Sequence, residues 1–124
     1  MSDIILSPLN HTWFIDLDGT LVKHNGYLMD GNDTLLNGAK SFLDNIPDAD
    51  YIIITTSRTE EYKERTIEFL NQQKIRYNQI IFGLPYGERI LINDDKPSGL
   101  KMSKAICLSR DNFDIEKIII DKSL

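Results

Sequence analysis

Short apolar runs separated by polar turns recur along the chain, and their lengths are typical of strands. Five runs rich in β-branched and aromatic residues are predicted as buried strands, at 12–15, 51–54, 80–82, 90–92 and 118–120. The run at 51–54 is apolar at every position, as in a parallel strand that is covered on both faces.

Two stretches have apolar residues at helical spacing. The first predicts a helix over 34–45, with Asp33 or Asn32 as its cap and Pro47 beyond its end. The second opens at Ser57, which has Glu60 three residues later in the pattern of a capping box. Its expected buried stripe comprises Tyr62, Thr66, Ile67, Phe69 and Leu70. The pattern over 99–112 is ambiguous, and we favour one helix or a helical turn there.

Asn25 and Gly26 stand between two short apolar stretches, directly after the first predicted strand. Asn-Gly is a strong hairpin signal, because a type I′ turn needs positive φ at both central residues. We therefore predict a small hairpin over 21–28.

Alternation of strands and helices predicts an α/β fold, formed by residues 1–124 as a single domain. We expect a three-layer Rossmann-like arrangement, with a mainly parallel sheet of about five strands and helices on both faces. In such sheets the reactive site lies at the carboxyl ends of the strands. Three polar clusters each follow an apolar run and should converge on that edge: Asp16/Asp18, Thr55/Thr56/Ser57 and Asn93/Asp94/Asp95.

The composition of the chain counts against several classes of function. The chain has 124 residues and a formal charge of −5, from 14 Lys and Arg against 19 Asp and Glu, which counts against a general nucleic-acid or membrane-surface binder. A single cysteine, Cys107, excludes an intrachain disulfide and a cysteine-based zinc site. With no apolar run long enough to span a membrane and no secretory pattern over 1–10, we expect a cytoplasmic protein.

Four acidic residues dominate the predicted edge. Asp16 and Asp18, one residue apart on an extended segment, point to the same side. Asp94 and Asp95 should reach the same place from another strand, and such a cluster repels itself unless a divalent cation neutralises it. Oxygen ligands of this kind suit Mg²⁺. We therefore predict a magnesium site.

The same edge carries donors for an anion. Thr56 and Ser57 supply hydroxyl and backbone N–H groups where a helix begins, which favours a bound phosphate. An aspartate can attack phosphorus, and a second carboxylate two residues away can protonate the leaving alcohol and then deprotonate water. Asp16 and Asp18 fit these two roles.

The segment Phe14-Ile15-Asp16-Leu17-Asp18-Gly19-Thr20 resembles the first motif, DxDGT, of the haloacid dehalogenase superfamily of phosphatases. Residues 53–58 and 91–95 resemble its second and fourth motifs, and the hairpin resembles its flap. The resemblance implies Asp16 as nucleophile, Asp18 as acid/base and Thr56 as phosphate ligand. It also implies Mg²⁺ bound by Asp16, Asp94 and the Asp18 carbonyl.

The third motif of this family is a lysine or arginine, and the chain departs from it. Leu84 of Gly83-Leu84-Pro85 stands where the cation is expected, and Arg89, Lys96 or Arg58 are the candidates to replace it. Either Asn93-Asp94 or Asp94-Asp95 is the paired acidic motif, so Asp95 is a second candidate metal ligand.

The spacing leaves no room for a cap domain, so the chain resembles the short, capless members of the family. An open site suits a large substrate, or a small one enclosed by a second copy in a homo-oligomer. The motif Ile-Asn-Asp-Asp-Lys is also similar to phosphatases of bacterial surface-polysaccharide and sugar-phosphate pathways. We therefore expect hydrolysis of a small phosphorylated metabolite.

Two alternatives remain at this point. One is a weakly active or inactive phospho-binding domain, similar to a receiver domain. In receivers, however, the phosphorylated Asp ends a later strand, whereas the run at 80–82 is followed by Gly83. The other is a nucleic-acid end phosphatase, against which the net charge of −5 counts.

Overall fold

The structure, a computed structural model, describes residues 3–124 and divides them into two compact units. The larger unit comprises Asn10–Pro85 and Leu108–Asp114. The smaller unit comprises residues 3–9, Tyr86–Cys107 and Ile115–Leu124. The organisation of the chain as a single domain stays a prediction.

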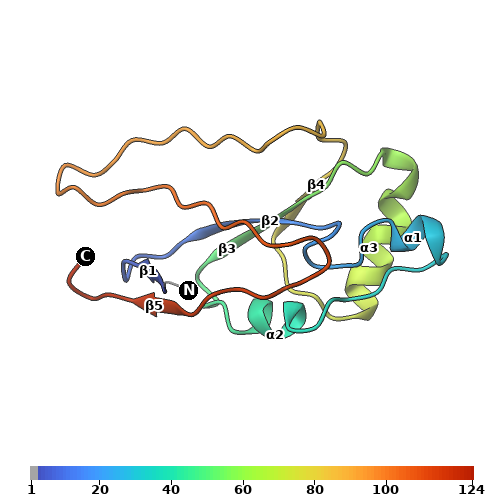
Figure 1. Cartoon of the computed structure of the whole chain (residues 1–124), viewed down its shortest axis with the longest axis horizontal. Helices are drawn as coiled ribbons and strands as arrows, with labels where there is room; N and C mark the ends of the chain where they lie inside the picture. Colours follow the sequence, from blue (N-terminus) through green and yellow to red (C-terminus); the bar gives the residue numbers. More distant parts are fainter. Residues whose placement is uncertain (1–2) are drawn as a thin grey trace. The chain divides into compact units, whose positions relative to one another are not determined.

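A three-stranded parallel sheet forms the centre of the larger unit (Figure 1). Its strands are β2 (Thr12–Asp16), β3 (Tyr51–Thr55) and β4 (Gln79–Ile81), in the order β2-β3-β4. These confirm the strands predicted at 12–15, 51–54 and 80–82. The register sets Asp16 beside Thr55, and Thr55 beside Ile81, so the three strands end together.

The smaller unit contains a two-stranded parallel sheet of β1 (Ile4–Leu6) and β5 (Ile118–Ile120). The strand predicted at 118–120 is confirmed, whereas β1 had not been predicted. The α/β class and the parallel strands are thus as expected, but the described strands form two small sheets instead of one sheet of about five.

The strand predicted at 90–92 is wrong, because residues 86–96 contain no strand. Ile90, Leu91 and Ile92 are 83%, 54% and 90% exposed. A segment forms a strand only where its backbone hydrogen-bonds to a neighbouring strand. An apolar run in the sequence does not show which segment that neighbour is, or whether there is one. The helix or helical turn expected within 99–112 is also wrong, since these residues form only a turn at 110–111, in which Asp111 has a left-handed φ of 62°.

The helices are shorter than predicted. They are α1 (Gly26–Met29), α2 (Ala39–Asp44), the 3₁₀ turn η1 (Glu60–Tyr62) and α3 (Lys63–Gln72). Helix α2 begins at Ala39 and not at 34, because Gly38 before it has a left-handed φ of 87°. The residues before Gly38 pair instead with the loop after β2, through Lys23 N–H to Thr34 O and Leu36 N–H to Leu21 O.

The capping box at Ser57 does not form. The residue that caps η1 is Thr59, and the Ser57 hydroxyl donates to the Pro85 carbonyl at 3.4 Å. The predicted hairpin over 21–28 is wrong as well, since Gly26 begins α1. A type I′ turn needs positive φ at both central residues, but here only Asn25 has it, at 57°.

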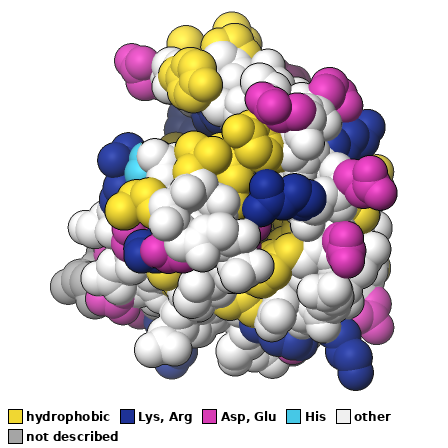
Figure 2. Space-filling view, turned by 90° about the vertical axis from the view of Figure 1, so that its right-hand side faces the viewer, with side chains coloured by type: hydrophobic (Ala, Val, Ile, Leu, Met, Phe, Trp, Pro, Cys, Tyr) yellow, Lys and Arg dark blue, Asp and Glu magenta, His cyan; other side chains and the backbone are white. Residues whose placement is uncertain are grey.

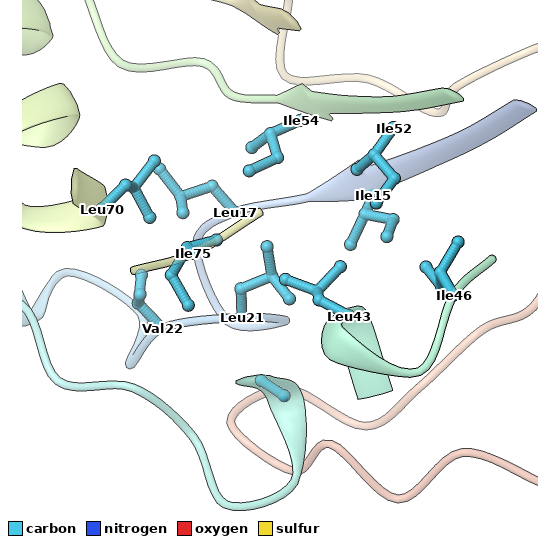
Figure 3. Close-up of a cluster of buried hydrophobic side chains, with 11 residues drawn as sticks. Ile15, Leu17, Leu21, Val22, Leu43, Ile46, Ile52, Ile54, Leu70 and Ile75 are labelled. Carbon is cyan, nitrogen blue, oxygen red and sulfur yellow. The ribbon is translucent and has the colours of Figure 1, made fainter. Parts of the chain in front are cut away.

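The core lies on one face of the three-stranded sheet. Ile15, Ile52 and Ile54 point from the strands toward Leu43 of α2 and Leu70 of α3 (Figure 3). The cluster is completed by Leu17, Leu21, Val22, Ala39, Ile46 and Ile75. On the opposite face Phe14 and Tyr51 are 58% and 44% exposed. Within this unit both long helices thus cover the same face, whereas helices had been expected on both faces.

Acidic and basic side chains are interspersed on the face seen in Figure 2, and apolar side chains lie among them. In the part of the chain that is described, no helix has the length and apolar character needed to cross a membrane.

Candidate functional site

Asp16 and Asp18 lie at the carboxyl end of β2. Asp16 is the last residue of the strand, and the next amide, Leu17 N–H, still donates to the Thr55 carbonyl at 3.0 Å. Beyond it the chain turns sharply, with the N–H groups of Leu21 and Val22 donating to the Leu17 carbonyl. The backbone thus holds both aspartates at the end of the sheet, as predicted.

Gly19 makes this turn possible. Its φ of 82° lies in the left-handed region, which a residue with a side chain adopts only at a cost. Its N–H donates to the Val22 carbonyl at 2.7 Å, and the Thr20 hydroxyl donates to Asp16 Oδ2 at 3.2 Å. The glycine and threonine of the DxDGT motif therefore close the turn and orient the first aspartate.

A segment distant in sequence packs against the turn. Asp111 N–H donates to the Gly19 carbonyl at 2.8 Å, and Asp111 Oδ1 accepts from His24 N–H at 2.6 Å. Arg110 lies so close that a Cβ on Gly19 would be 3.2 Å from its Cγ. Sequence reasoning missed this cation, because no motif surrounds it and only the tertiary fold brings it to Gly19.

Thr56 and Arg58 reach the turn from the segment that follows β3. The Thr56 side chain is fully buried, and its hydroxyl donates to Asp18 Oδ2 at 3.0 Å while accepting Arg58 N–H at 3.1 Å. Arg58 donates to Asp18 Oδ1 through Nε at 3.1 Å and through Nη2 at 2.8 Å. Both oxygens of Asp18 are therefore held: Arg58 donates to each of them, and Thr56 donates to Oδ2 as well.

The same guanidinium binds a second carboxylate. Arg58 Nη1 and Nη2 donate to Asp33 Oδ2 and Oδ1 at 2.9 and 2.6 Å, and Nη1 also donates to Thr66 Oγ1 at 2.9 Å. The ring of Tyr27 stacks on the guanidinium at 3.8 Å. We call Asp18, Arg58 and Asp33 the acidic bridge; their side chains are 17%, 2% and 6% exposed.

Electrostatics follows from this geometry. Burial alone would lower the pKa of Arg58, but its hydrogen bonds to Asp33 and Asp18 and their charges outweigh burial and raise it above its ordinary value. Burial, followed by the charge of Asp18, raises the pKa of Tyr27, and the nearby Arg58 opposes that rise. Arg58 is thus a permanent cation between two carboxylates.

A cavity of about 260 Å³ lies beside Arg58 and Asp33 of the acidic bridge. Arg58, Asp33 and Tyr27 line it together with residues of α1, α3 and their loops, including Tyr62, Arg65 and Gln72. Arg65 Nη2 donates to the carbonyl of Gly31, another residue of the lining, at 3.1 Å.

The remaining predicted site residues are divided between the units. Ser57 is half-buried in the larger unit, where its hydroxyl meets Pro85. Arg89, Lys96, Asp94 and Asp95 lie in the smaller unit, all exposed. There Asp95 accepts from Lys101 Nζ at 2.6 Å, and Arg89 Nη1 donates to the Gly87 carbonyl. Their membership of one site with Asp16 stays a prediction.

The donor set at the end of β2 fits the chemistry of magnesium, since carboxylate and carbonyl oxygens are its preferred ligands. Within residues 3–124, no group of three His, Cys, Asp or Glu side chains lies together in a form that would hold a metal ion. Asp16 ends β2 and Asp18 lies in the turn after it, and the magnesium site there stays a prediction.

Comparisons with models of protein families, with curated proteins and with solved structures each gave no match.

Proposed function

We propose that the chain is a magnesium-dependent phosphatase of the haloacid dehalogenase type, acting on a small phosphorylated metabolite such as a sugar phosphate. The observation that carries the proposal is the meeting of Asp16, Asp18 and Thr56 at the ends of β2 and β3. Asp16 stands beside Thr55 in register, and the Thr56 hydroxyl lies 3.0 Å from Asp18. Two carboxylates and a hydroxyl donor at one sheet edge suit transfer of a phosphoryl group.

In the proposed reaction, an Asp16 carboxylate oxygen forms a bond to phosphorus while the bond from phosphorus to the leaving oxygen breaks. For this step Asp18 carries a proton on Oδ2, so the Thr56 hydroxyl turns from that oxygen toward the phosphate while Arg58 keeps Oδ1. Asp18 gives the proton to the leaving oxygen, which departs as an alcohol. Asp18 then takes a proton from water as the water oxygen attacks phosphorus, and the Asp16–phosphorus bond breaks. Inorganic phosphate leaves, and both aspartates return to their starting states.

Magnesium, held by Asp16 and by further oxygen ligands, would neutralise charge on the phosphate oxygens. Asp94 and Asp95 are the proposed acidic ligands from the smaller unit. Thr56, Ser57, Arg58, Arg89 and Lys96 are the proposed phosphate contacts, of which Arg58 is already bound on both sides by carboxylates.

Hydrolysis of an aryl phosphate by the purified chain tests the proposal. We expect turnover that requires Mg²⁺ and stops when a chelator is added. Asp16→Asn should abolish it, because the amide is a poor nucleophile, while Asp48→Asn, at an exposed position, should leave it unchanged. Intact-mass analysis of quenched wild-type protein should find one added phosphoryl group, which is absent in Asp16→Asn. Turnover without metal, or near-normal turnover by Asp16→Asn, would contradict the proposal.

A second candidate is a phospho-binding domain with little turnover. It is favoured by the acidic bridge, because both oxygens of Asp18 are held by Arg58 and Thr56. Such a domain would become phosphorylated on Asp16 and keep the phosphoryl group. In the same experiment, a stable mass increase without release of phosphate would support this alternative.

A further inference from the structure

The acidic bridge contains a residue that the proposed reaction does not use. Asp33 lies in the loop before α2, and the sequence pattern predicts it as a helix cap. In the structure its carboxylate is nearly buried and binds Arg58 by two hydrogen bonds, at 2.6 and 2.9 Å. Asp33 therefore shares the Arg58 guanidinium with Asp18, the proposed acid and base.

Arg58 is held on every edge of its planar guanidinium. Asp18 takes Nε and Nη2, Asp33 takes Nη2 and Nη1, and Thr66 takes Nη1 as well. The ring of Tyr27 covers one face. Because the guanidinium is a rigid fork, fixing its far edge also fixes the edge that it offers to Asp18.

We propose that Asp33 is a positioning residue that fixes the carboxylate of Asp18 through Arg58, so that Asp18 faces the leaving oxygen of the substrate. Two carboxylates repel each other, so Asp33 acts on Asp18 through the cation that they share. The inference rests on the proposed function, in which Asp18 transfers a proton to that oxygen.

The role predicts a dependence on the leaving group. A poor leaving group, such as the alkoxide of an alkyl phosphate, needs a well-placed proton donor, whereas 2,4-dinitrophenolate departs without one. Misplacing Asp18 should therefore slow hydrolysis of the alkyl phosphate far more than that of 2,4-dinitrophenyl phosphate. The ratio of the two rates within one preparation does not depend on the fraction of folded enzyme, so it separates positioning from stability.

The experiment measures kcat/KM with Mg²⁺ for both substrates in the wild type, Asp33→Asn and Arg58→Lys. Asp33→Asn keeps the shape of the side chain but removes its charge, and Arg58→Lys keeps the charge but removes the fork. For Asp33→Asn we expect about a 10- to 100-fold loss on the alkyl phosphate and less than about 3-fold on the dinitrophenyl ester. Arg58→Lys also loses a proposed phosphate contact, so it should slow both esters, and the alkyl phosphate about 10-fold more than the other. The control Asp30→Asn breaks an exposed pair with Lys23 and should change neither rate.

A double-variant cycle adds a second readout. If Asp33 acts through Arg58, then Asp33→Asn combined with Arg58→Lys should lose little more on the alkyl phosphate than Arg58→Lys alone. Asp33→Glu restores the charge and should recover part of the lost ratio.

Each contrary outcome is distinct. An equal loss on both substrates would make Asp33 a merely structural residue and overturn the inference, while leaving the phosphatase proposal in place. No loss on either substrate would also overturn the inference and leave the phosphatase proposal in place. A wild type that hydrolyses neither ester would overturn the proposed function and this inference with it. If Asp33→Asn does not fold, Asp33→Glu decides the question, because it moves the carboxylate, and a leaving-group ratio equal to that of the wild type would overturn the inference.

Discussion

Thr56→Val tests the junction between β3 and the turn after β2. Valine has nearly the shape of threonine, so the change removes the hydroxyl and leaves the packing almost unaltered. Thr56 is fully buried, and its hydroxyl makes one bond to the Asp18 carboxylate and accepts another from Arg58 N–H. A bond to a charged group contributes about 1.5–3 kcal/mol, and a buried N–H left unpaired costs about 1–3 kcal/mol. Because the two losses share one site and partly relax together, we expect a decrease of about 2–4 kcal/mol in the free energy of unfolding.

Urea unfolding followed by circular dichroism measures this change, with an unaltered m value showing that the same surface is exposed. The melting temperature should fall by roughly 10 °C or more. Thr56→Ser keeps the hydroxyl and is the matched control, which should lose less than half as much. If Thr56→Val is as stable as the wild type, the hydroxyl bonds do not stabilise the junction between β3 and the turn after β2, and the reasoning is refuted.

Two further changes probe the turn at Gly19. Gly19→Ala should lower the free energy of unfolding by about 1–2 kcal/mol or more, because alanine is strained at a φ of 82° and its Cβ would press on Arg110. Gly87→Ala, with open space around it and no positive φ, is the control, and equal urea midpoints for the two variants would contradict the strain argument. Arg110→Ala should raise KM for an aryl phosphate about 10-fold or more if this cation binds the phosphate. Parallel measurements on Arg89→Ala and Lys96→Ala identify the cation, and an unchanged KM for Arg110→Ala would exclude Arg110.

Strands β2, β3 and β4 could be predicted because their residues carry the signal locally. β-branched and aromatic residues in runs such as 51–54 favour extended backbone, and each of these three runs has a neighbouring strand with which it pairs. The turn after β2 was predictable for a similar reason, since the Asp-Gly-Thr sequence both permits the left-handed φ and supplies its hydrogen bonds. Local chemistry thus located the end of β2 and the two aspartates on it.

Elements that depend on a partner were not predictable. The run at 90–92 has the composition of a buried strand, but it forms none in the structure, and its three aliphatic side chains are largely exposed. Asn25-Gly26 has the composition of a hairpin turn, yet it opens α1. A pattern of residue types gives the local preference of a segment but not the partner that a strand or hairpin needs.

The acidic bridge is the clearest case of this kind, and it also bears on function. The sequence predicts Arg58 as a substrate contact and Asp33 as a helix cap, because each prediction uses only the residues next to it in the chain. A buried ion pair generally adds little stability over apolar packing of the same volume, since burial removes the water that solvated both charges. Here one cation lies between two carboxylates, so the bridge keeps a net negative charge and its contribution to stability is smaller still. Orientation of Asp18 accounts for the bridge better than stability does, because a rigid fork bound on both edges restricts a carboxylate more tightly than a single hydrogen bond could.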